Sequence, residues 1–161
     1  MIVIVMGVVG AGKTTIGKLL AAQLGWEFAD ADDFHPPANV EKIRNGIPLD
    51  DRDREPWLDR LRAAIVEWVA DRRNVVLACS ALKRSYRAKL EVGPEVRFVY
   101  LKGSAPLIAD RLSARHGHFA GEAILASQLA DLEEPESALI VEISETPDQI
   151  VAQIRKGLDL E

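Results

Sequence analysis

The sequence predicts a three-layer α/β domain built around a parallel sheet, and three observations support this fold class. Five short apolar runs recur along the chain, and four of them are almost continuously apolar, which is typical of parallel strands buried on both faces. Segments whose apolar residues have helical spacing lie between these runs. A glycine-rich motif that usually joins a strand to a helix follows the first run directly. Alternating strands and helices favour right-handed crossovers and helices on both faces of one sheet.

The apolar runs place the expected strands, and the helical spacing places the helices between them. The strands are expected at residues 2–6, near Phe28, and at residues 75–79, 98–101 and 139–143. The apolar helix faces comprise Ile16, Leu19, Leu20 and Leu24 in the first helix, Trp57, Leu58, Leu61, Ile65, Trp68 and Val69 in another, and Ile150, Val151, Ile154 and Leu158 in the last.

Two segments, residues 30–55 and 111–135, do not fit a minimal strand–helix–strand repeat. Both are rich in charge, His, Gly or Pro. In open α/β sheets, ligands usually bind beyond the carboxyl ends of the strands, where additional segments of this kind lie. We therefore expect these two segments to bind ligands, with long surface loops as the alternative.

Length, charge and cysteine content restrict the class of protein. A chain of 161 residues fits one domain, which we place at residues 1–161. The net charge of −5 argues against a general nucleic-acid or membrane-surface binder, and no apolar run reaches the length of about 18 residues that a membrane span needs. The single cysteine, Cys79, excludes an internal disulfide and is typical of a reducing compartment, so we expect a cytoplasmic protein.

The stretch GVVGAGKT, residues 7–14, matches the nucleotide-binding motif G-x-x-x-x-G-K-[ST] in full and lies between an expected strand and an expected helix. Glycines let the backbone curl so that several N–H groups point at one phosphate, and the start of the helix adds its positive end. Lys13 can reach the terminal phosphates, and the hydroxyl of Thr14 can bind Mg²⁺. The motif therefore predicts a phosphate loop for a nucleoside triphosphate, which we expect to be ATP with Mg²⁺.

The acidic residues expected beside the nucleotide follow the second strand. ATPases and GTPases of this class usually carry an acid at the end of a later strand, but the run at residues 75–79 continues into Ser80 without one. Asp30 and Asp32 follow the second expected strand instead, and in an extended strand end they would project to the same side. This arrangement suits a small-molecule kinase, in which one carboxylate serves Mg²⁺ and another orients the acceptor hydroxyl.

An acceptor-binding segment is expected at about residues 30–58, with a second contribution from the stretch ACSALKRSYR at residues 78–87. Both contain basic residues suited to an anionic acceptor, because arginine pairs bidentately with carboxylate or phosphate. A solvated surface is the alternative for each basic residue taken singly. His35 either binds the acceptor or caps the helix that follows. The candidate cations are Lys42, Arg54, Lys83 and Arg87.

A lid over the nucleotide is expected at about residues 111–128. The stretch RLSARHGHF concentrates cations that could stabilise charge on the transferred group, and Gly117 and Gly121 would allow a movement that excludes water. An ordinary amphipathic helix is the alternative. The candidate cations of the lid are Arg111, Arg115, His116 and His118.

On these stretches the chain resembles the gluconokinases of the thermoresistant type, which are small relatives of shikimate kinase and the nucleoside monophosphate kinases. The resemblance spans about residues 3–135. It is carried by MGVVGAGKTT, DADDFHPPANVEKIRNGIPLDDRDREPWL and ACSALKRSYR, and by GHF followed by SQLADLEEP, in this order. Many kinases share the first stretch, whereas the second and third are far more specific. Ala120 is a departure in the expected lid, because it stands where the family usually has Met.

The resemblance implies ATP-dependent phosphorylation of D-gluconate at its 6-hydroxyl with Mg²⁺. It implies a P-loop NTPase sandwich like that of the nucleoside monophosphate kinases, with a five-stranded parallel sheet, a mobile lid and commonly a homodimer. By likeness to kinases with a D-x-D pair, Asp30 would act through Mg²⁺ and Asp32 would serve as base. Motifs and resemblance together assign Lys13, Asp32, Arg111 and Arg115 to catalysis, Gly7, Gly10, Ala11, Gly12, Lys13, Thr14, Thr15 and Arg111 to the nucleotide, Thr14 and Asp30 to the metal, and Asp32, His35, Lys42, Arg54, Ser80, Lys83, Arg87, His118 and Gln128 to the acceptor.

Three other functions remain open on the sequence. A shikimate kinase or another sugar-acid kinase would use similar cations. A nucleotide kinase is less favoured, because the acceptor segment offers only Phe34 and Trp57 for base stacking. An ATP-binding module without turnover is also less favoured, because it would not need the intact set of phosphate-loop and aspartate residues.

Overall fold

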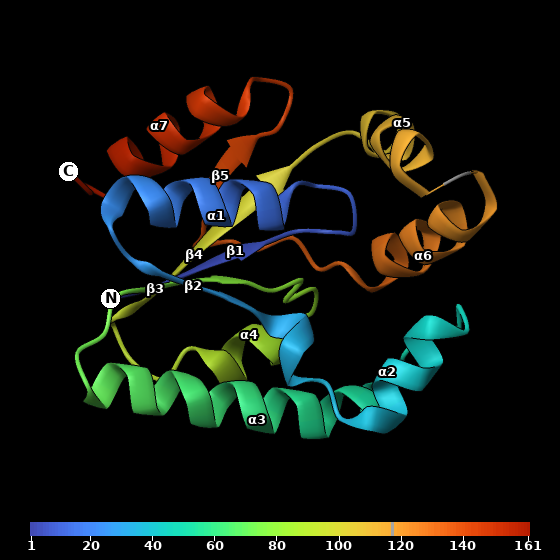
Figure 1. The fold of residues 1–161 in the computed structure, drawn as a ribbon, viewed down its shortest axis with the longest axis horizontal. Helices are drawn as coiled ribbons and strands as arrows, with labels where there is room; N and C mark the ends of the chain where they lie inside the picture. Colours follow the sequence, from blue (N-terminus) through green and yellow to red (C-terminus); the bar gives the residue numbers. More distant parts are fainter. Residues whose placement is uncertain (117) are drawn as a thin grey trace.

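The computed structural model describes residues 1–116 and 118–161, and the side chains of residues 115–122 lie outside the described part. Five parallel strands form one sheet in the order β2-β3-β1-β4-β5, which confirms the predicted α/β class (Figure 1). Each predicted strand is present with ends shifted by no more than two residues. The strands are β1 (Ile2–Met6), β2 (Glu27–Asp30), β3 (Val75–Ala78), β4 (Val96–Lys102) and β5 (Leu139–Glu142).

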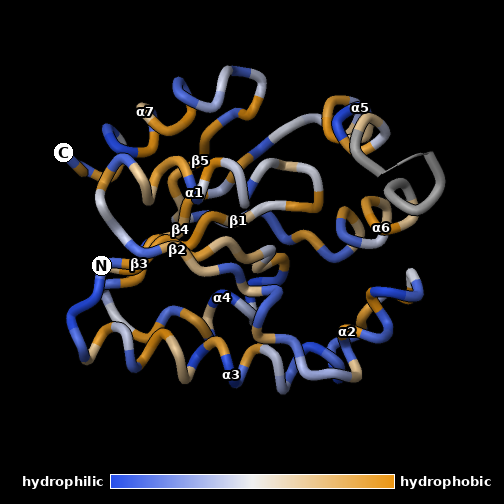
Figure 2. The backbone as a smooth tube through the Cα atoms, viewed as in Figure 1, coloured by the Kyte–Doolittle hydropathy of each residue, from blue (hydrophilic) through white to orange (hydrophobic). Residues whose placement is uncertain are grey.

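The central strands β1 and β3 are buried along their whole length, which explains their continuous apolar sequences. Ile4 of β1 pairs with Leu77 of β3 on one side and with Phe98 of β4 on the other. Figure 2 shows the resulting hydrophobic sheet, with polar residues concentrated on the outer faces of the helices. The sheet is therefore a fixed platform whose strand ends position the loops.

Two helical layers cover the sheet (Figure 1). Helices α1 (Lys13–Leu24) and α7 (Pro147–Gly157) pack on one face, where Val3 and Val5 of β1 meet them. Helices α3 (Asp51–Ala70) and α4 (Arg84–Leu90) cover the other face, where Ile4 and the other alternate residues of β1 point. Successive side chains of β1 point to opposite faces of the sheet, so alternate residues of this strand belong to two different hydrophobic cores. None of the helices that the described residues form has the length and apolarity that crossing a membrane requires.

Local sequence signals set the helix ends. Gly25 ends α1 in the left-handed region, with φ of 68°. Helix α3 begins with a capping box in which Asp50 and Asp53 each accept a hydrogen bond from the other's backbone N–H. Thr146 and Gln149 form the same arrangement at the start of α7. The capping box of Asp50 and Asp53 fixes where α3 begins, and α3 carries several side chains of the site.

The remaining helices lie beyond the carboxyl ends of the strands (Figure 1). They are α2 (Pro37–Arg44), α5 (Ala105–His116) and α6 (His118–Asp131), and the short 3-10 helix η1 (Ala31–Phe34) connects β2 to α2. The two segments that did not fit the minimal repeat are therefore mainly helical. They gather at the strand ends where the sequence predicted ligand binding.

Candidate active site

The loop between β1 and α1 has the backbone shape of a phosphate loop. Gly10 and Gly12 adopt φ of 81° and 96°, values that favour glycine. A Cβ atom at Gly10 would also come within 2.7 Å of Leu112 Cγ, so α5 packs directly on the loop. Helix α1 begins immediately afterwards at Lys13, and its first N–H groups open toward the loop. The ammonium of Lys13 donates a hydrogen bond to Val8 O over 3.0 Å.

A pocket of about 230 Å³ opens over this loop. Gly7 and Ala11, also assigned to the nucleotide, support the loop from beneath: Gly7 N–H donates to Ser80 O over 3.4 Å, and Ala11 N–H donates to Val8 O over 3.1 Å. We refer to the pocket over the loop as the phosphate pocket. Its described lining is Val9, Gly10, Gly12, Lys13, Thr14, Thr15, Asp30, Asp32, Ala78, Ser80 and Gln128.

Thr14 and Asp30 form a pair of oxygen ligands at the edge of the phosphate pocket. Thr14 Oγ1 donates to Asp30 Oδ2 over 3.4 Å, and Asp30 Oδ1 accepts from Asp32 N–H over 2.9 Å. Hydroxyl and carboxylate oxygens suit Mg²⁺, which usually binds one or two protein groups together with phosphates and water. Within the described residues there is no cluster of three or more His, Cys, Asp or Glu side chains that could hold a metal ion alone. The pair therefore fits a metal that is shared with a bound triphosphate.

Asp32 does not lie in an extended strand end, so the strand-alternation argument for its direction was wrong. Strand β2 ends at Asp30, whose carboxylate caps η1, and Asp32 is a residue of that short helix. Its carboxylate nevertheless reaches the phosphate pocket beside Asp30. Partial desolvation and then the nearby charge of Asp30 raise the pKa of Asp32, and Lys13 acts in the opposite direction. Because 83% of the side chain is exposed to solvent, water weakens these effects.

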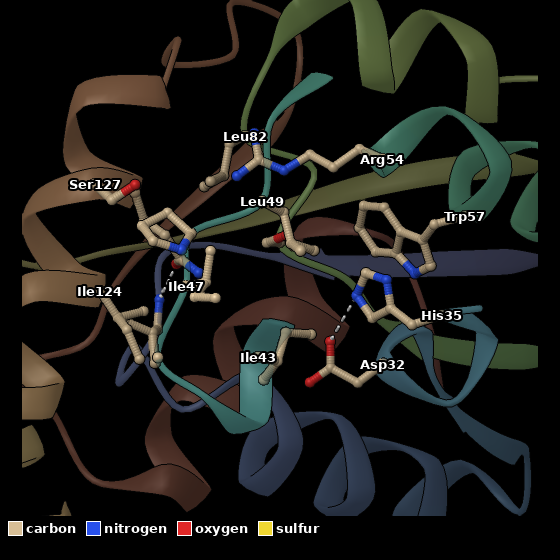
Figure 3. Close-up of a pocket in the computed structure, with 15 residues that line it drawn as sticks. Asp32, His35, Ile43, Ile47, Leu49, Arg54, Trp57, Leu82, Ile124 and Ser127 are labelled. Carbon is tan, nitrogen blue, oxygen red and sulfur yellow. Dashed lines mark hydrogen bonds and ion pairs between the residues drawn. The ribbon is translucent and has the colours of Figure 1, made fainter. Parts of the chain in front are cut away.

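A second pocket of about 220 Å³ adjoins the phosphate pocket (Figure 3). We refer to it as the acceptor pocket. It lies between η1, the segment from α2 to α3, and α6, and one wall is apolar. The two pockets share Val9, Asp32, Ser80 and Gln128. The other described residues that line it are His35, Ile43, Gly46, Ile47, Pro48, Leu49, Arg54, Trp57, Leu82, Ile124 and Ser127.

His35 is held firmly in the wall of the acceptor pocket (Figure 3). Its ring stacks on Trp57 with the centroids 4.5 Å apart and the planes 15° apart. Asn39 Nδ2 lies 3.2 Å from Nδ1 of the ring, and Asp32 Oδ1 lies 3.8 Å from Nε2. Burial and then the positive charge of Arg54 lower the pKa of His35 to about 4. The imidazole is therefore neutral near pH 7. Its backbone N–H caps the end of η1 by donating to Asp32 O. The expected cap of the helix that follows was wrong, because Pro36 is the N-cap of α2 and no side chain caps that end.

Arg54 lines the acceptor pocket and is held by two partners. Its Nη1 donates to Tyr86 OH over 3.0 Å and to Asp131 Oδ2 over 2.9 Å. Both bonds start at Nη1, so Nη2 and Nε remain the donors suited to a carboxylate in the pocket. Tyr86 also donates to Asp51, which links the guanidinium to a wider polar network. Arg54 is thus held in place at the wall of the pocket by two hydrogen bonds.

Ser80 and Gln128 lie where the two pockets join. Val9 N–H of the phosphate loop donates to Gln128 Oε1 over 2.6 Å. This bond fixes the amide so that its NH₂ group is the part free to donate to an acceptor molecule. Ser80 follows β3 directly, and the next residue, Ala81, is buried with φ of 45°. The sharp turn thus places Ser80 at the junction.

Four predicted cations fall outside the described lining of both pockets. Lys42 makes an ion pair with Asp53 over 2.8 Å and ties α2 to the start of α3. Lys83 makes an ion pair with Asp51 over 2.8 Å. The positions of Lys42 and Lys83 do not support direct contact with an acceptor.

Arg87 and Arg111 are the other two, and both donate to backbone carbonyls. Arg87 is buried, with donor bonds of 2.7 Å to Ala81 O, 3.0 Å to Leu82 O and 2.7 Å to Glu133 O. It therefore holds the turn after β3 and does not point into the acceptor pocket. Arg111 Nη2 donates to Ile143 O over 2.6 Å. The predicted roles of Arg115, His118 and the departure Ala120 concern side chains outside the described part.

Sequence reasoning missed several residues that shape the site. Trp57 was expected in the core and considered for base stacking, yet one face of its indole supports His35. Asn39, Tyr86 and Asp131 lie in the stretches that carry the family resemblance, but no role was assigned to them. Tyr86 and Asp131 contact Arg54 from 32 and 77 positions away in the chain, a separation that local patterns do not reveal.

Comparison with known proteins agrees with this geometry. A sequence model of the shikimate kinase family matches residues 9–157. Gluconokinase of Gluconobacter oxydans (strain 621H) is 44% identical over 163 residues, which cover 98% of this chain and 91% of that protein. Thermoresistant gluconokinase of Escherichia coli (strain K12) is 39% identical over 165 residues, which cover 97% and 94%.

Among solved structures, one is similar in both sequence and fold and another in fold alone. A gluconokinase from Sinorhizobium meliloti 1021 superimposes with a TM-score of 0.86 and 42% identity, covering 98% of this chain and 90% of that one. Shikimate kinase from Aquifex aeolicus vf5 superimposes with a TM-score of 0.60 at 16% identity, covering 99% and 96%. The second likeness concerns the fold alone and agrees with a P-loop kinase architecture.

Proposed function

Because this chain belongs to the gluconokinase family, which is related to shikimate kinase, we propose that it transfers the γ-phosphoryl group of ATP to the 6-hydroxyl of D-gluconate. The products are 6-phospho-D-gluconate and ADP. One observation of the structure carries the proposal: the phosphate pocket and the acceptor pocket share Val9, Asp32, Ser80 and Gln128. A triphosphate on the loop and a small acceptor next to it would meet at a carboxylate.

The chemistry follows from that junction. The 6-hydroxyl oxygen forms a bond to the γ-phosphorus, and the bond from this phosphorus to the β–γ bridging oxygen breaks, so ADP leaves. The hydroxyl proton passes to the carboxylate of Asp32, which lies where the two pockets join. Lys13 and the N–H groups of the loop hold the phosphates in place. Orientation of the hydroxyl matters as much as basicity, because the transition state is loose.

Mg²⁺ belongs to the proposal, and Thr14 and Asp30 are the residues that would hold it. Their oxygens lie 3.4 Å apart at the edge of the phosphate pocket. A bound Mg²⁺ would neutralise charge on the β- and γ-phosphates. Asp30 is suited to this role more than Asp32, because it is the carboxylate that contacts Thr14.

The acceptor pocket matches the groups of gluconate. Arg54 offers two free donor positions for the carboxylate, and Gln128 and His35 offer donors for hydroxyl oxygens. The apolar wall includes Ile43 and Ile47, which are about half exposed and would be covered by a bound acceptor. Lys42, Lys83 and Arg87 would support the site through their neighbours rather than by touching gluconate.

Several finer expectations stay predictions. They are the lid at residues 111–128 with Arg111, Arg115 and His118 over the nucleotide, the homodimer, and the cytoplasmic location. No nucleic-acid or membrane partner is proposed. The contact between Gln128 and Val9 supports a link from α6 to the phosphate loop, which is what a lid would need.

An acceptor panel tests the proposal. ADP release would be measured with ATP and Mg²⁺ against D-gluconate, shikimate, glycerate and AMP. D-Gluconate should give the highest kcat/KM by a wide margin. Equal or better turnover of shikimate or AMP would favour another kinase. If no ADP were released with any of the four acceptors, a nucleotide-binding module without turnover would be favoured.

A further inference from the structure

Asn39 is a buried polar residue that the proposed reaction does not yet use. Among the described residues, the polar or charged residues that are buried as a whole are Asn39, Arg54 and Arg87. The two arginines have clear roles, in the acceptor pocket and in the turn after β3. Asn39 lies in α2 and is only 2% exposed, yet its amide bonds no group of its own helix. Both of its described contacts go to residues around the acceptor pocket.

The orientation of the Asn39 amide is fixed by the backbone of α3. Nδ2 donates to Asp53 O over 2.7 Å. In the flipped orientation, Oδ1 would face this carbonyl oxygen with no hydrogen between them, which is unfavourable for two buried acceptors. The NH₂ group must therefore face Asp53, and its second hydrogen points to Nδ1 of His35, 3.2 Å away. Since the amide nitrogen can only donate, Nδ1 must offer its lone pair.

The rest of the surroundings fix the ring itself. His35 stacks on Trp57, and Trp57 is held by a hydrogen bond of 2.7 Å from Nε1 to Ala31 O. The charged groups that act on the ring are Arg54 of α3 and the aspartates of β2 and η1, and burial with Arg54 keeps the ring neutral. A neutral ring whose Nδ1 accepts carries its proton on Nε2. Nε2 faces Asp32 and the acceptor pocket (Figure 3).

We propose that Asn39 is a positioning residue that holds His35 in the Nε2–H tautomer, so that His35 is a hydrogen-bond donor to the acceptor and is excluded as the base. The part that concerns the acceptor rests on the proposed function, whereas the tautomer does not. In the other tautomer, the lone pair of Nε2 would face the carboxylate of Asp32, and two acceptors would repel across 3.8 Å. The pocket would also lose a donor and gain a second base. Asn39 thus leaves Asp32 as the single base at the junction.

Nitrogen NMR of the protein labelled with ¹⁵N-histidine tests the tautomer directly. His35 would be assigned by comparison with His35→Gln. At pH 7, with and without gluconate, Nε2 should show the shift of a protonated ring nitrogen and Nδ1 that of an unprotonated one. A protonated Nδ1, or a mixture of the two tautomers, in the wild-type protein would overturn the proposal. This result does not depend on the acceptor, so it separates failure of the tautomer from failure of the gluconate assignment.

Two substitutions test the role of Asn39. Asn39→Asp replaces the donor with an acceptor, so the proton should move to Nδ1, and kcat/KM for gluconate should fall on the order of tenfold while KM for ATP stays the same. In a plot of kcat against pH, the acid limb of this variant should also move to higher pH. The new carboxylate beside the ring of His35 favours the protonated imidazolium form. Asn45→Asp is the matched control, since it adds the same charge at the exposed end of α2.

Asn39→Ser removes the amide without adding a charge and covers the case in which Asn39→Asp fails to fold. It should give a mixture of tautomers and a loss in kcat/KM for gluconate. If Asn39→Ser kept a pure Nε2–H tautomer and the wild-type kcat/KM, Asn39 would be a structural residue only, and the proposal would be wrong. A loss of stability without any change in tautomer or kinetics would lead to the same conclusion.

Discussion

Asp30 and Asp32 are two positions apart in the chain, but their carboxylates have different surroundings. Asp30 contacts Thr14 and caps η1, whereas Asp32 has a raised pKa and lies where the two pockets join. Asp30→Asn should therefore raise the Mg²⁺ concentration needed for half-maximal rate. Asp32→Asn should leave Mg²⁺ and ATP binding nearly unchanged, weaken gluconate binding and lower kcat. Initial rates over a matrix of Mg²⁺ and gluconate concentrations measure both profiles.

The two substitutions control for each other, because both remove one charge from the same cleft. Full kcat in Asp32→Asn, or recovery of its rate at high Mg²⁺, would contradict the role as base. Exchanged profiles would mean that the metal and base roles belong to the opposite residues.

His35 gives the folded protein a specific dependence on pH. Its pKa falls from an ordinary value of 6.5 to about 4, so between these pH values the unfolded chain binds a proton that the folded protein does not. The free energy of unfolding should therefore rise with pH across this window, and the stability that His35 contributes is lost as pH falls from 6.5 toward 4. The upper bound is roughly 3 kcal/mol for this one group.

Urea denaturation of the wild type and of His35→Gln at several pH values between 4 and 7 measures this contribution. The difference in unfolding free energy between pH 7 and pH 4 should be smaller in the variant than in the wild type. A loss of stability that is the same at every pH cancels in this difference. Equal pH dependence of the two proteins would show that His35 is not held neutral.

At the scale of elements, Arg87 holds the turn after β3 against the segment that follows α6. Three carbonyls accept from its guanidinium, and the turn contains Ala81 in the left-handed region. Arg87→Ala would leave the buried carbonyl of Ala81 without this donor and remove a bond to Glu133 O, whereas Leu82 O would keep the backbone N–H of Glu133. We therefore expect a loss of about 2 kcal/mol in the free energy of unfolding. Arg84→Ala is the matched control, because Arg84 is exposed on the same helix. Chemical denaturation of both variants measures the difference.

The kinetic effect of Arg87→Ala separates a structural role from the role that the sequence predicted. Because the side chain points away from the acceptor pocket, folded Arg87→Ala should retain a KM for gluconate within a few-fold of the wild type. A large rise in KM with unchanged stability would show that Arg87 binds the acceptor after all.

Helix α6 and the phosphate loop are connected through one hydrogen bond, from Val9 N–H to Gln128 Oε1. Since Gln128 lines both pockets, we expect it to couple the two substrates. In Gln128→Ala, a non-hydrolysable ATP analogue should improve gluconate affinity less than it does in the wild type. Titration calorimetry with and without the analogue measures this coupling, and Gln153→Ala on the exposed face of α7 is the control. Undiminished coupling in Gln128→Ala would remove this role.

For the whole molecule, the parts that the sequence predicted well are those encoded by short-range patterns. Continuous apolar runs mark β1 and β3 because both faces of these strands are covered, and the phosphate loop is recognisable because its glycines have fixed spacing. Asp32 lines both pockets, but the reason given for its direction was incorrect, because β2 ends at Asp30 and the Asp30 carboxylate caps the short helix η1 that contains Asp32. Local alternation cannot anticipate such a turn.

The partners of the charged residues could not be predicted, because tertiary contacts select them. Lys42 and Lys83 were candidates to bind an anionic acceptor, but each forms an ion pair with an aspartate at the start of α3. Arg87 pairs with carbonyls as far as 46 positions away, and Arg54 with a carboxylate 77 positions away. The sequence does not distinguish a basic residue that lines a pocket from one that pairs with a neighbouring side chain. Only the fold determines which contact the residue makes.

The most direct test of the central claim is ³¹P NMR of the product that the protein forms from ATP, Mg²⁺ and D-gluconate. The account predicts one new phosphomonoester whose phosphorus signal is split into a triplet by the two protons of a methylene group, which places the phosphate on the 6-oxygen. A doublet would place the phosphate on a secondary carbon and contradict the orientation of gluconate between Arg54 and Asp32. Formation of inorganic phosphate and ADP alone would contradict phosphoryl transfer to gluconate altogether.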